Sequence, residues 1–329
     1  MKLQLLNGSS PIVILMATYN GGLYLEKQIQ SIISQSYTNW QLIIRDDGSV
    51  DNSIEVIKKF KELDSRVKQI ITQSTKHGSC ANFSELYSWV KTNYKMEYLM
   101  FCDQDDIWLS NKIEVSLNIL KQTEQINRNA PCLVYGRLHI MDELGHELKE
   151  EINYTHYHPQ FNNIIIQNPM FGCTMMINKE LIDLMAYIPN DIENHDYWVA
   201  LIAVFFGRCT AIQEKIILYR QHINNVSSQG ASFKKRFDRY FNNKRQVKEL
   251  KAKILMLSLF YNEYCLKLNL HQQNVMSAFL KSFRYNSPLH LIFIIIKHKI
   301  FKITFLQTFA FFYILIFNFK KMNNYIKYI

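Results

Sequence analysis

The sequence predicts an α/β fold in which a mostly parallel sheet is flanked by helices. Short, continuously apolar runs alternate with segments of helical periodicity through the first 120 residues. Continuous apolar runs are typical of strands that are buried on both faces, as in parallel sheets. Polar clusters follow three of these runs, and ligands of α/β sheets bind at the carboxyl ends of strands. The sequence therefore predicts a binding site along one edge of the sheet.

The first four strands and their helices alternate in chain order, which predicts βαβ units. The expected strands cover residues 11–16, 41–45, 67–71 and 98–102. The helices that follow them have apolar residues three or four positions apart, at 25, 29, 32 and 33, at 56, 60 and 63, at 83, 86, 87 and 90, and at 113, 117 and 120. Residues 131–219 are less regular, with strand-like runs at 132–135 and 172–177 and a helix expected at 197–206. We interpret them as the second half of the same domain.

Charge divides the chain at residue 230. The formal net charge is +10, but residues 1–230 hold 20 Lys/Arg against 25 Asp/Glu, whereas residues 231–329 hold 18 against three. We therefore expect an α/β domain over 1–230 and a basic, aromatic-rich helical region over 231–329. A basic aromatic surface suits an anionic membrane or a nucleic acid, and composition alone does not choose between them.

An uncharged segment lies inside the basic region. Residues 303–319 contain no charged side chain across 17 positions, and lysines stand before and after them. A spanning helix usually needs about 20 apolar residues, so this run is at the short limit. A helix in the membrane interface, anchored by aromatics and lysines, and plain packing in a water-soluble helix are the other two interpretations. A long uncharged run does not suit nucleic-acid binding, so we expect no nucleic-acid partner.

The six cysteines, at positions 80, 102, 132, 173, 209 and 265, form no C-x-x-C pair. At these spacings we expect reduced thiols in the cytosol rather than a zinc site or a disulfide framework. Residues 1–10 contain no long apolar run before the first strand, so no cleaved signal peptide is expected.

Three carboxylates stand within four residues at the end of the fourth strand, namely Asp103, Asp105 and Asp106. Crowded like charges repel one another unless a cation lies among them. Oxygen ligands of this kind suit Mg²⁺ or Mn²⁺ carrying phosphates. A solvated acidic turn is the alternative interpretation of this segment when it is considered alone.

Three motifs, taken together and in chain order, resemble the nucleotide-sugar-binding half of inverting family 2 glycosyltransferases with the GT-A fold. They are Ala17-Thr18-Tyr19-Asn20, Asp46-Asp47-Gly48-Ser49 with Asp51, and Asp103-Gln104-Asp105-Asp106. Later motifs are similar to the bacterial rhamnosyltransferase-like branch, at residues 171–175, 194–198 and 219–222 with Asn224 and Asn225. The resemblance covers roughly residues 11–230. It implies a Rossmann-like mixed sheet flanked by helices over these residues. From their charge and aromatic content we expect residues 231–329 to be a helical, membrane-associating extension.

In this family the loops after the first two strands hold the nucleoside, which implies that role for Thr18, Asn20, Asp46 and Asp47. An ordinary tight turn is the alternative for the second loop, because Asp-Gly favours positive φ.

The family's D-x-D motif corresponds here to Asp103 and Asp105. The resemblance implies that Asp103 faces the ribose or a water on the metal, and that Asp105 binds Mg²⁺ or Mn²⁺ and through it the diphosphate. It further implies that Arg220 and His222 close over the diphosphate, the arginine as a charge clamp and the histidine as a third metal ligand. A structural role for His222 is the alternative.

Inverting transfer is a direct displacement at the anomeric carbon and needs a base on the acceptor hydroxyl. The resemblance implies that Asp196 is this base. Its alternative role is a helix N-terminal residue stabilised by the helix dipole. The family often has an acidic residue immediately before this aspartate, whereas here the neighbour is His195. This difference suits the rhamnosyltransferase-like branch.

The function implied by the resemblance is transfer of a sugar, with L-rhamnose from dTDP-rhamnose as the first candidate, from a nucleotide-sugar donor to a lipid-linked cell-surface glycan. We expect this to occur at the cytoplasmic face of the bacterial inner membrane, with the basic region on the membrane surface. The alternatives are another donor, such as a UDP-hexose, and a non-catalytic subunit that keeps the same fold.

Overall fold

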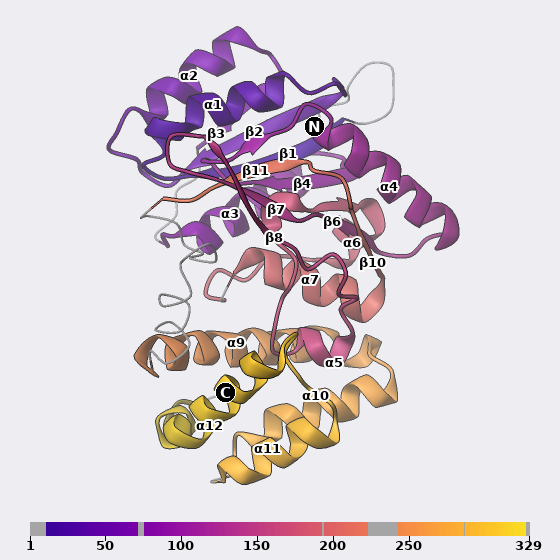
Figure 1. The fold of residues 1–329 in the computed structure, drawn as a ribbon. Coiled ribbons are helices and arrows are strands. Elements are labelled where there is room, and N and C mark those ends of the chain that lie inside the picture. The colour runs from indigo at the N-terminus through magenta and orange to yellow at the C-terminus, as the bar shows by residue number, and fades with distance from the viewer. Residues whose placement is uncertain (1–10, 72–75, 193, 223–242, 286, 327–329) are drawn as a thin grey trace. The chain divides into compact units, whose positions relative to one another are not determined.

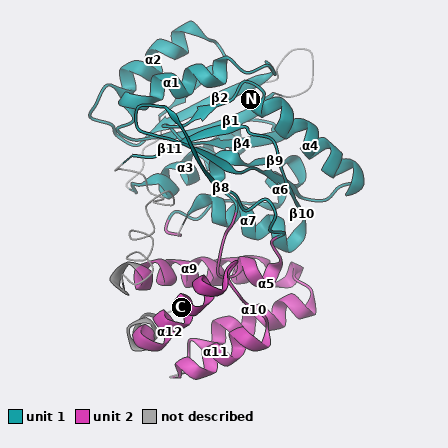
Figure 2. Cartoon of the chain, viewed as in Figure 1, with its two compact units in different colours: residues 1–158, 170–190, 194–230 teal, residues 159–169, 191–193, 231–329 magenta. Residues whose placement is uncertain are grey.

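The computed structural model describes residues 11–71, 76–192, 194–222, 243–285 and 287–326. The chain divides into two compact units, which Figure 2 colours separately. Unit 1 contains residues 1–158, 170–190 and 194–230, and unit 2 contains 159–169, 191–193 and 231–329. The change in charge along the sequence predicts a single division, at residue 230. Two short segments from the earlier part of the chain therefore belong with the helical region.

Unit 1 is built on a seven-stranded mixed sheet with the strand order β10-β6-β9-β4-β1-β2-β3 (Figure 1). These strands are β1 (Ile12–Thr18), β2 (Trp40–Asp46), β3 (Val67–Ile70), β4 (Tyr98–Cys102), β6 (Cys132–Tyr135), β9 (Met176–Asn178) and β10 (Arg208–Ala211). Neighbouring strands from β4 to β3 are parallel, whereas β9 runs antiparallel to both β4 and β6. The mixed sheet confirms the predicted α/β fold class.

A smaller sheet has the order β5-β11-β7-β8 and contains β5 (Ile107–Trp108), β7 (Leu138–Met141), β8 (Glu147–Ile152) and β11 (Ile217–Arg220). Strand β5 begins directly after the acidic motif and pairs with β11, where Trp108 lies opposite Ile217. This pairing brings the end of β11 next to a motif more than 100 positions earlier in the chain.

Helices cover both faces of the large sheet in unit 1. On one face, α1 (Gly22–Ile33), α2 (Ser53–Leu63) and α4 (Lys112–Ile126) share a core with the alternate residues Ile12, Ile14 and Met16 of β1. The helices α3 (Ser79–Asn93), α6 (Lys179–Leu184) and α7 (His195–Phe206) lie on the other side (Figure 1). Because successive side chains of a strand alternate between faces, a fully apolar β1 supplies both layers.

Two local predictions were wrong. Leu63, expected in the buried stripe of α2, is the last residue of the helix and is 69% exposed. The strand expected at 172–177 begins only at Met176, and Gly172–Thr174 forms a short 3₁₀ turn instead. That turn is closed by hydrogen bonds from the backbone N–H and the hydroxyl of Thr174 to the carbonyl of Phe171.

Unit 2 is helical and contains α5 (Phe161–Ile164), α9 (Asn243–Tyr264), the 3₁₀ turn η2 (Cys265–Lys267), α10 (Leu270–Ser282), α11 (Pro288–Lys297) and α12 (Phe305–Ile326). Asn269 and Gln272 form a capping box at the start of α10, and the Ser287 hydroxyl accepts from His290 N–H at the start of α11. Within the described part of the chain, no helix combines the length and the hydropathy that a membrane span requires.

Side-chain amides attach the segment 159–169 to the rest of unit 2. Asn163 Nδ2 donates to the carbonyl of Phe301 at 3.0 Å, and Gln167 Oε1 accepts from Ile303 N–H at 2.9 Å. Lys253 Nζ of α9 donates to the carbonyl of Ile166 at 2.9 Å. The first two bonds satisfy backbone groups between α11 and α12, and the third joins the segment to α9. The segment 159–169, which lies between two strands of unit 1 in the sequence, is therefore hydrogen-bonded into unit 2.

Candidate active site

The predicted site residues are all in unit 1. Parallel pairing places Thr18 beside Asp46 at the ends of β1 and β2, and Met16 beside Cys102 at the ends of β1 and β4. The three loops that carry the predicted motifs therefore leave the sheet at one edge. This follows from the common direction of the three strands.

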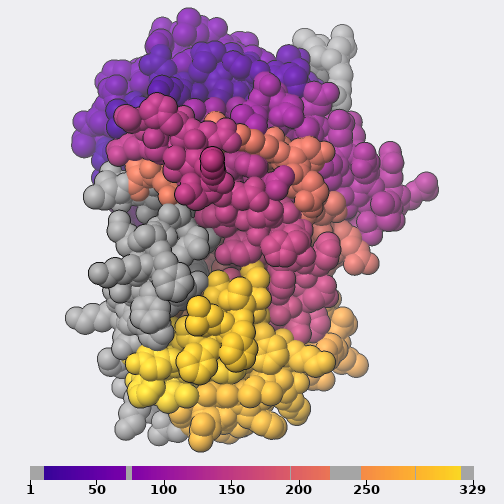
Figure 3. All heavy atoms as spheres, in the orientation of Figure 1, coloured from indigo at the N-terminus to yellow at the C-terminus, as the bar shows by residue number. Residues whose placement is uncertain are grey.

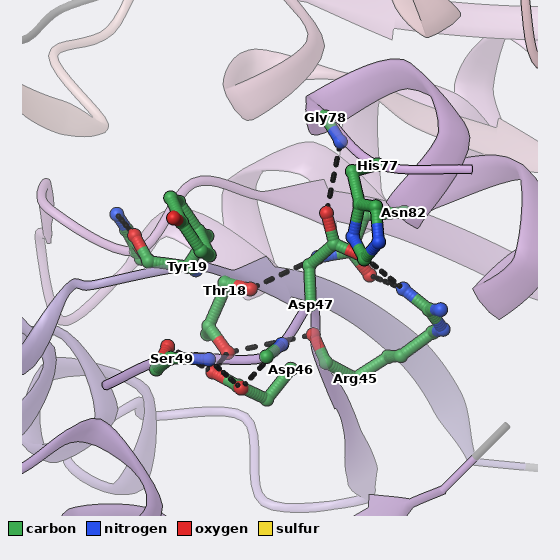
Figure 4. Close-up of polar contacts among 11 residues, drawn as sticks. Thr18, Tyr19, Arg45, Asp46, Asp47, Ser49, His77, Gly78 and Asn82 are labelled. Carbon is green, nitrogen blue, oxygen red and sulfur yellow. Dashed lines mark hydrogen bonds and ion pairs between the residues drawn. The ribbon is translucent and has the colours of Figure 1, made fainter. Parts of the chain in front are cut away.

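The loop after β2 is a tight turn organised by Asp46 (Figure 4). Asp46 Oδ1 accepts from the backbone N–H groups of Gly48 and Ser49 at 3.0 and 2.7 Å. Its Oδ2 accepts from the hydroxyls of Thr18 and Ser49 at 2.8 and 2.6 Å. Gly48 has a φ of 90°, in the left-handed region that favours glycine. Asp46 and Thr18 thus join the first two loops, and their contact with a nucleoside stays a prediction.

Asn20 makes a second connection between the same loops. Its backbone N–H donates to Ser49 Oγ at 2.8 Å, and its side-chain Oδ1 accepts from Val50 N–H at 2.9 Å. Asn20 has a φ of 47°, which asparagine tolerates better than most side chains. Asn20 and Tyr19 are both exposed, so their outer surfaces remain accessible to a ligand.

Asp47 is buried at 6% exposure and is held by charged and polar neighbours (Figure 4). Its Oδ2 accepts from Gly78 N–H at 2.8 Å, and its Oδ1 lies 3.3 Å from both Arg45 Nη1 and His77 Nδ1. Arg45 Nη1 also donates to Asn82 Oδ1 at 2.8 Å. Sequence reasoning missed Arg45 and Asn82, although a charged residue inside the apolar run of β2 was a signal that something opposite must pair with it.

Gln104, between the two aspartates of D-x-D, was also missed. Its Oε1 accepts from Tyr19 N–H at 2.9 Å and its Nε2 donates to the Tyr19 carbonyl at 3.1 Å. The amide thus pairs with the N–H and the C=O of one residue, as a neighbouring strand does, and fixes the loop after β1 to the loop after β4. A Cβ on Gly21 would lie 2.4 Å from Gln104 Oε1, so this close approach requires glycine.

Asp105 and His222 meet although 117 positions separate them in the chain. Asp105 Oδ2 lies 2.8 Å from His222 Nε2, and the two side chains are only 14% and 7% exposed. The ring of Tyr24 stacks on the imidazole with the ring centres 4.9 Å apart. The pairing of β5 with β11 produces this meeting, which no local sequence pattern could reveal.

Arg220 is buried and holds backbone groups around the acidic motif. Its backbone N–H donates to Asp106 Oδ1 at 3.1 Å, and its Nε donates to the Asp105 carbonyl at 2.8 Å. Its Nη1 donates to the carbonyl of Glu143 at 2.9 Å. These contacts give Arg220 a positioning role in the protein, and its predicted contact with a diphosphate stays a prediction. Asn224 and Asn225, the last residues of the same motif, lie outside the described residues.

Asp103 and Asp196 lie in one electrostatic environment. Burial, together with the charges of Asp105 and Asp196, raises the pKa of Asp103 to about 7. Asp196 lies in the first turn of α7, and its Oδ2 accepts from Gly172 N–H at 3.1 Å. A Cβ on Gly172 would lie 3.0 Å from Asp196 Cβ and 2.8 Å from His195 Nε2. Glycine is therefore needed where the 170s loop crosses the start of α7.

Two sets of side chains among the described residues could hold a metal ion. In one, ligand atoms of Asp103, Asp106 and Cys173 lie within 4.8 Å of one another. Burial and the neighbouring carboxylates raise the pKa of Cys173 well above its usual range, and a soft sulfur ligand suits Mg²⁺ or Mn²⁺ poorly.

The other set is Asp105 with His222, whose facing atoms lie 2.8 Å apart. Two adjacent ligands on one Mg²⁺ or Mn²⁺ ion are separated by about 3 Å, because each bond is about 2.1 Å long. A carboxylate oxygen and an imidazole nitrogen both suit Mn²⁺, with Asp103 available nearby. Asp105 and His222 therefore fit two ligand positions of the expected divalent cation, whereas the ligand atoms of Asp103 group with those of Asp106 and Cys173.

Lys112, at the start of α4, is a buried cation that the sequence did not single out. It is fully buried, with its Nζ 4.7 Å from the centre of the Trp108 ring. Its Nζ and Asp106 Oδ2 have no hydrogen-bond partner among the described residues, and each lies in the other's field. Burial lowers the pKa of Lys112 to about 8. A lysine in the first turn of a helix is usually solvated, so the sequence pattern gave no indication that Lys112 is buried.

We expect Lys112→Met to lower the free energy of unfolding by about 1 kcal/mol, because it removes the attraction between Lys112 and Asp106, whose pKa burial and the neighbouring carboxylates already raise well above its usual range. All four tryptophans lie in unit 1, so urea unfolding followed by their fluorescence reports on this unit. The double variant Lys112→Met/Asp106→Asn should recover most of the loss. Full additivity of the two single effects would show that the two groups do not interact.

His195 is buried between aromatic rings, with its ring centre 3.8 Å from that of Phe83 and 5.2 Å from that of Phe101. Burial lowers its pKa to about 3, far below the ordinary value of 6.5. The unfolded chain therefore takes up a proton below pH 6.5 that the folded protein does not. Stability from this group is complete above the unfolded pKa and is lost as the pH falls toward the folded one.

From pH 7 to pH 5 we expect His195 to lower the free energy of unfolding by about 2 kcal/mol. His195→Phe preserves the ring stacking and should remove this part of the pH dependence, as measured by urea unfolding at both values. His146→Phe is the matched control, because His146 is exposed. If the free energy of unfolding depends on pH equally in wild type and in His195→Phe, the lowered pKa of His195 is contradicted.

A family model described as Glycosyl transferase family 2 matches residues 13–182. The dTDP-rhamnosyl transferase RfbG of Shigella flexneri is 31% identical over 242 residues, which covers 68% of this chain and 77% of the relative. The UDP-Glc:alpha-D-GlcNAc-diphosphoundecaprenol beta-1,3-glucosyltransferase WfgD of Escherichia coli is 24% identical over 229 residues, covering 68% and 81%.

Among solved structures, S. aureus TarS 1–349 in complex with UDP-GlcNAc has a similar fold. The TM-score is 0.53 at 14% sequence identity, and the match covers 96% of this chain and 90% of TarS 1–349. The fold agrees with the GT-A expectation. With the family model covering half of the chain and the motifs at the carboxyl ends of β1, β2 and β4, the chain belongs to glycosyl transferase family 2.

Proposed function

We propose that this protein is an inverting, metal-dependent glycosyltransferase that moves a sugar from a nucleotide-sugar donor to a lipid-linked glycan. The observation that carries the proposal is the convergence of Asp103, Asp196 and the Asp105–His222 pair in one unit, beside the loops after β1 and β2. The product would be part of a cell-surface polysaccharide, made at the cytoplasmic face of the bacterial inner membrane.

Each side chain has a chemical role in this proposal. Asp105 and His222 would hold Mg²⁺ or Mn²⁺, with Asp103 close to them, and the ion would supply positive charge that stabilises the departing diphosphate. Asp196 accepts the proton of the acceptor hydroxyl as that oxygen attacks the anomeric carbon and the bond to the diphosphate breaks. The Gly172 N–H donates to Asp196 Oδ2 and so fixes the orientation of the carboxylate.

Other contacts keep this arrangement rigid. Arg220 fixes the backbone at Asp105 from behind, and Gln104 joins the loop after β4 to the loop after β1. Rigid positioning matters because a displacement of about 1 Å at the reacting atoms costs about a hundredfold in rate. The loops of Asp46 and Asp47 stand beside the metal-binding side chains, where the nucleoside end of the donor would lie.

The first candidate for the donor is dTDP-rhamnose, because RfbG is the relative of 31% identity and is named a dTDP-rhamnosyl transferase. A UDP-hexose is the alternative, since WfgD is named for UDP-Glc. The lipid-linked acceptor is supported in the same way by the diphosphoundecaprenol in the name of WfgD and by the basic charge of residues 231–329.

The experiment is a panel of nucleotide sugars tested for binding and for slow hydrolysis, with Mg²⁺, with Mn²⁺ and with a chelator. Selective, metal-dependent use of dTDP-rhamnose would support the first candidate, and selective use of a UDP-hexose would identify the alternative donor. Absence of binding by folded protein, with every donor and either metal, would contradict the enzyme and favour a non-catalytic subunit.

A further inference from the structure

Two helices of unit 2, α11 and α12, expose large apolar side chains. The apolar face of α11 and α12 is defined here as Leu289, Phe293, Ile296, Phe305, Phe309 and Phe317. Phe305 is 87% exposed, Leu289 71% and Phe317 66%. Single exposed hydrophobic residues are normal on protein surfaces, but a group of them indicates an interaction site. Figure 3 shows the C-terminal residues, in yellow, at the surface on the side in view.

The exposed residues recur at helical spacing. In α11 they stand at positions 289, 293 and 296, and in α12 at 305, 309 and 317, with the ring of Tyr313 4.5 Å from that of Phe317. Positions 289, 293 and 296 are i, i+4 and i+7, and positions 305, 309 and 317 are i, i+4 and i+12, so each set spans about 120° or less around its helix. Each helix therefore presents a line of apolar side chains to solvent.

The opposite sides of the same helices form the core of unit 2. Leu291 and Ile295 of α11 and Ile314 and Leu315 of α12 are at most 3% exposed. Helix α12 packs against α9 with this inner side. The core thus fixes which side of each helix faces outward, and the outer apolar residues contribute little to the core. Because they are costly in water, their partner must be apolar.

The positive charge of the residues around the apolar face indicates which kind of partner the face binds. No aspartate or glutamate occurs after Glu263, whereas residues 264–329 contain nine lysines and arginines. Lys281, Arg284, Lys297 and Lys299 are exposed. A surface that combines aromatic side chains with uncompensated positive charge complements anionic phospholipid, where rings enter the headgroup region and lysines meet phosphate. A second copy of this chain would bring like charges together.

We propose that the apolar face of α11 and α12 lies in the interface of an anionic phospholipid membrane and is the surface by which unit 2 binds it. The inference deepens the proposed function and rests on it for its purpose, since it gives the enzyme a defined contact with the membrane that carries its acceptor. Both helices lie on the membrane with their inner sides still packed in unit 2.

The test is co-sedimentation of the full chain with vesicles of phosphatidylcholine alone and of equal parts phosphatidylcholine and phosphatidylglycerol. Wild type should bind the anionic vesicles more tightly, and Phe305→Ser/Phe309→Ser/Phe317→Ser should bind them at least about tenfold more weakly. The matched control is Leu63→Ser/Ile71→Ser/Ile126→Ser, which removes three apolar side chains of unit 1 that are 69%, 89% and 83% exposed. It should bind as wild type does.

A second variant isolates the charges. Lys297→Gln/Lys299→Gln should weaken binding to the anionic vesicles by about fivefold for each lysine and leave binding to neutral vesicles unchanged. Circular dichroism confirms that each variant keeps its helices. Equal binding of the phenylalanine variant and wild type would overturn the proposal. Two other results would also overturn it if the protein does not bind vesicles. One is a concentration-dependent dimer in sedimentation velocity that requires the same phenylalanines, and the other is binding to an RNA probe that requires them.

Donor hydrolysis in solution distinguishes failure of this inference from failure of the proposed function. The phenylalanine variant alters unit 2 alone, and hydrolysis of the donor needs no membrane, so it should hydrolyse donor at the wild-type rate. Normal hydrolysis without vesicle binding by wild type would overturn only the membrane surface. Vesicle binding without any donor use would overturn only the enzyme.

Discussion

Asp105→Asn should lower metal-dependent transfer by at least about a hundredfold and shift the Mn²⁺ dependence to higher concentration. The amide keeps the size of the side chain and can still contact His222 Nε2, now 2.8 Å from the carboxylate. It loses the negative charge that a divalent ion requires. The effect should therefore fall on metal affinity and on rate while the fold is kept.

His222→Gln should show a smaller loss of the same kind, because a side-chain carbonyl replaces the imidazole and the charge of Asp105 remains. The measurement is the initial rate as a function of Mn²⁺ concentration, with Mn²⁺ binding followed separately by electron paramagnetic resonance. Asp142→Asn is the matched control, since this carboxylate pairs with His146 on the surface and only its backbone carbonyl faces Arg220. An unchanged Mn²⁺ dependence in Asp105→Asn would refute the ligand assignment.

The sequence predicted the part of the site that depends on strand ends. Thr18, Asp46 and Asp103 each follow an apolar run, and parallel strands necessarily bring their carboxyl ends to one edge. The same argument locates the metal motif without any structure. It works because burial on both faces leaves a strong signature in consecutive residues.

Contacts that depend on tertiary pairing could not be predicted in this way. His222 reaches Asp105 only because β11 pairs with β5, a two-residue strand with no periodicity of its own. Arg220, expected at a diphosphate, donates its described side-chain hydrogen bonds to carbonyl groups and its backbone N–H to the Asp106 carboxylate. Polar side chains that satisfy backbone groups look the same in sequence as polar side chains that contact a ligand.

Unit 2 shows the same limit for the domain boundary. The change in charge at residue 230 is visible in composition, but the segment 159–169 joins unit 2 through Asn163 and Gln167, whose amides bind carbonyl and N–H groups near residue 302. Neither asparagine nor glutamine is unusual in a loop, so nothing in the local pattern separates this segment from the strands on either side of it.

Asp196→Asn should reduce the rate of transfer by about a hundredfold to ten-thousandfold and leave donor binding unchanged. The amide oxygen can still accept from Gly172 N–H, which now donates to Asp196 Oδ2 at 3.1 Å, so the orientation of the side chain and the 170s loop are preserved. What the variant lacks is the basic oxygen that takes the acceptor proton. The alternative role, a carboxylate at the start of α7, predicts instead a loss of stability of about 1 kcal/mol or less and a nearly normal rate.

Single-turnover rates with saturating donor, together with the donor dissociation constant and the urea unfolding midpoint, separate these roles. Asp51→Asn serves as the control, because Asp51 also accepts backbone N–H groups in a loop of the same unit yet bonds to Gly22 and Ser53 rather than to the 170s loop. A near-normal rate in Asp196→Asn would assign this carboxylate to the helix and require another base for the displacement.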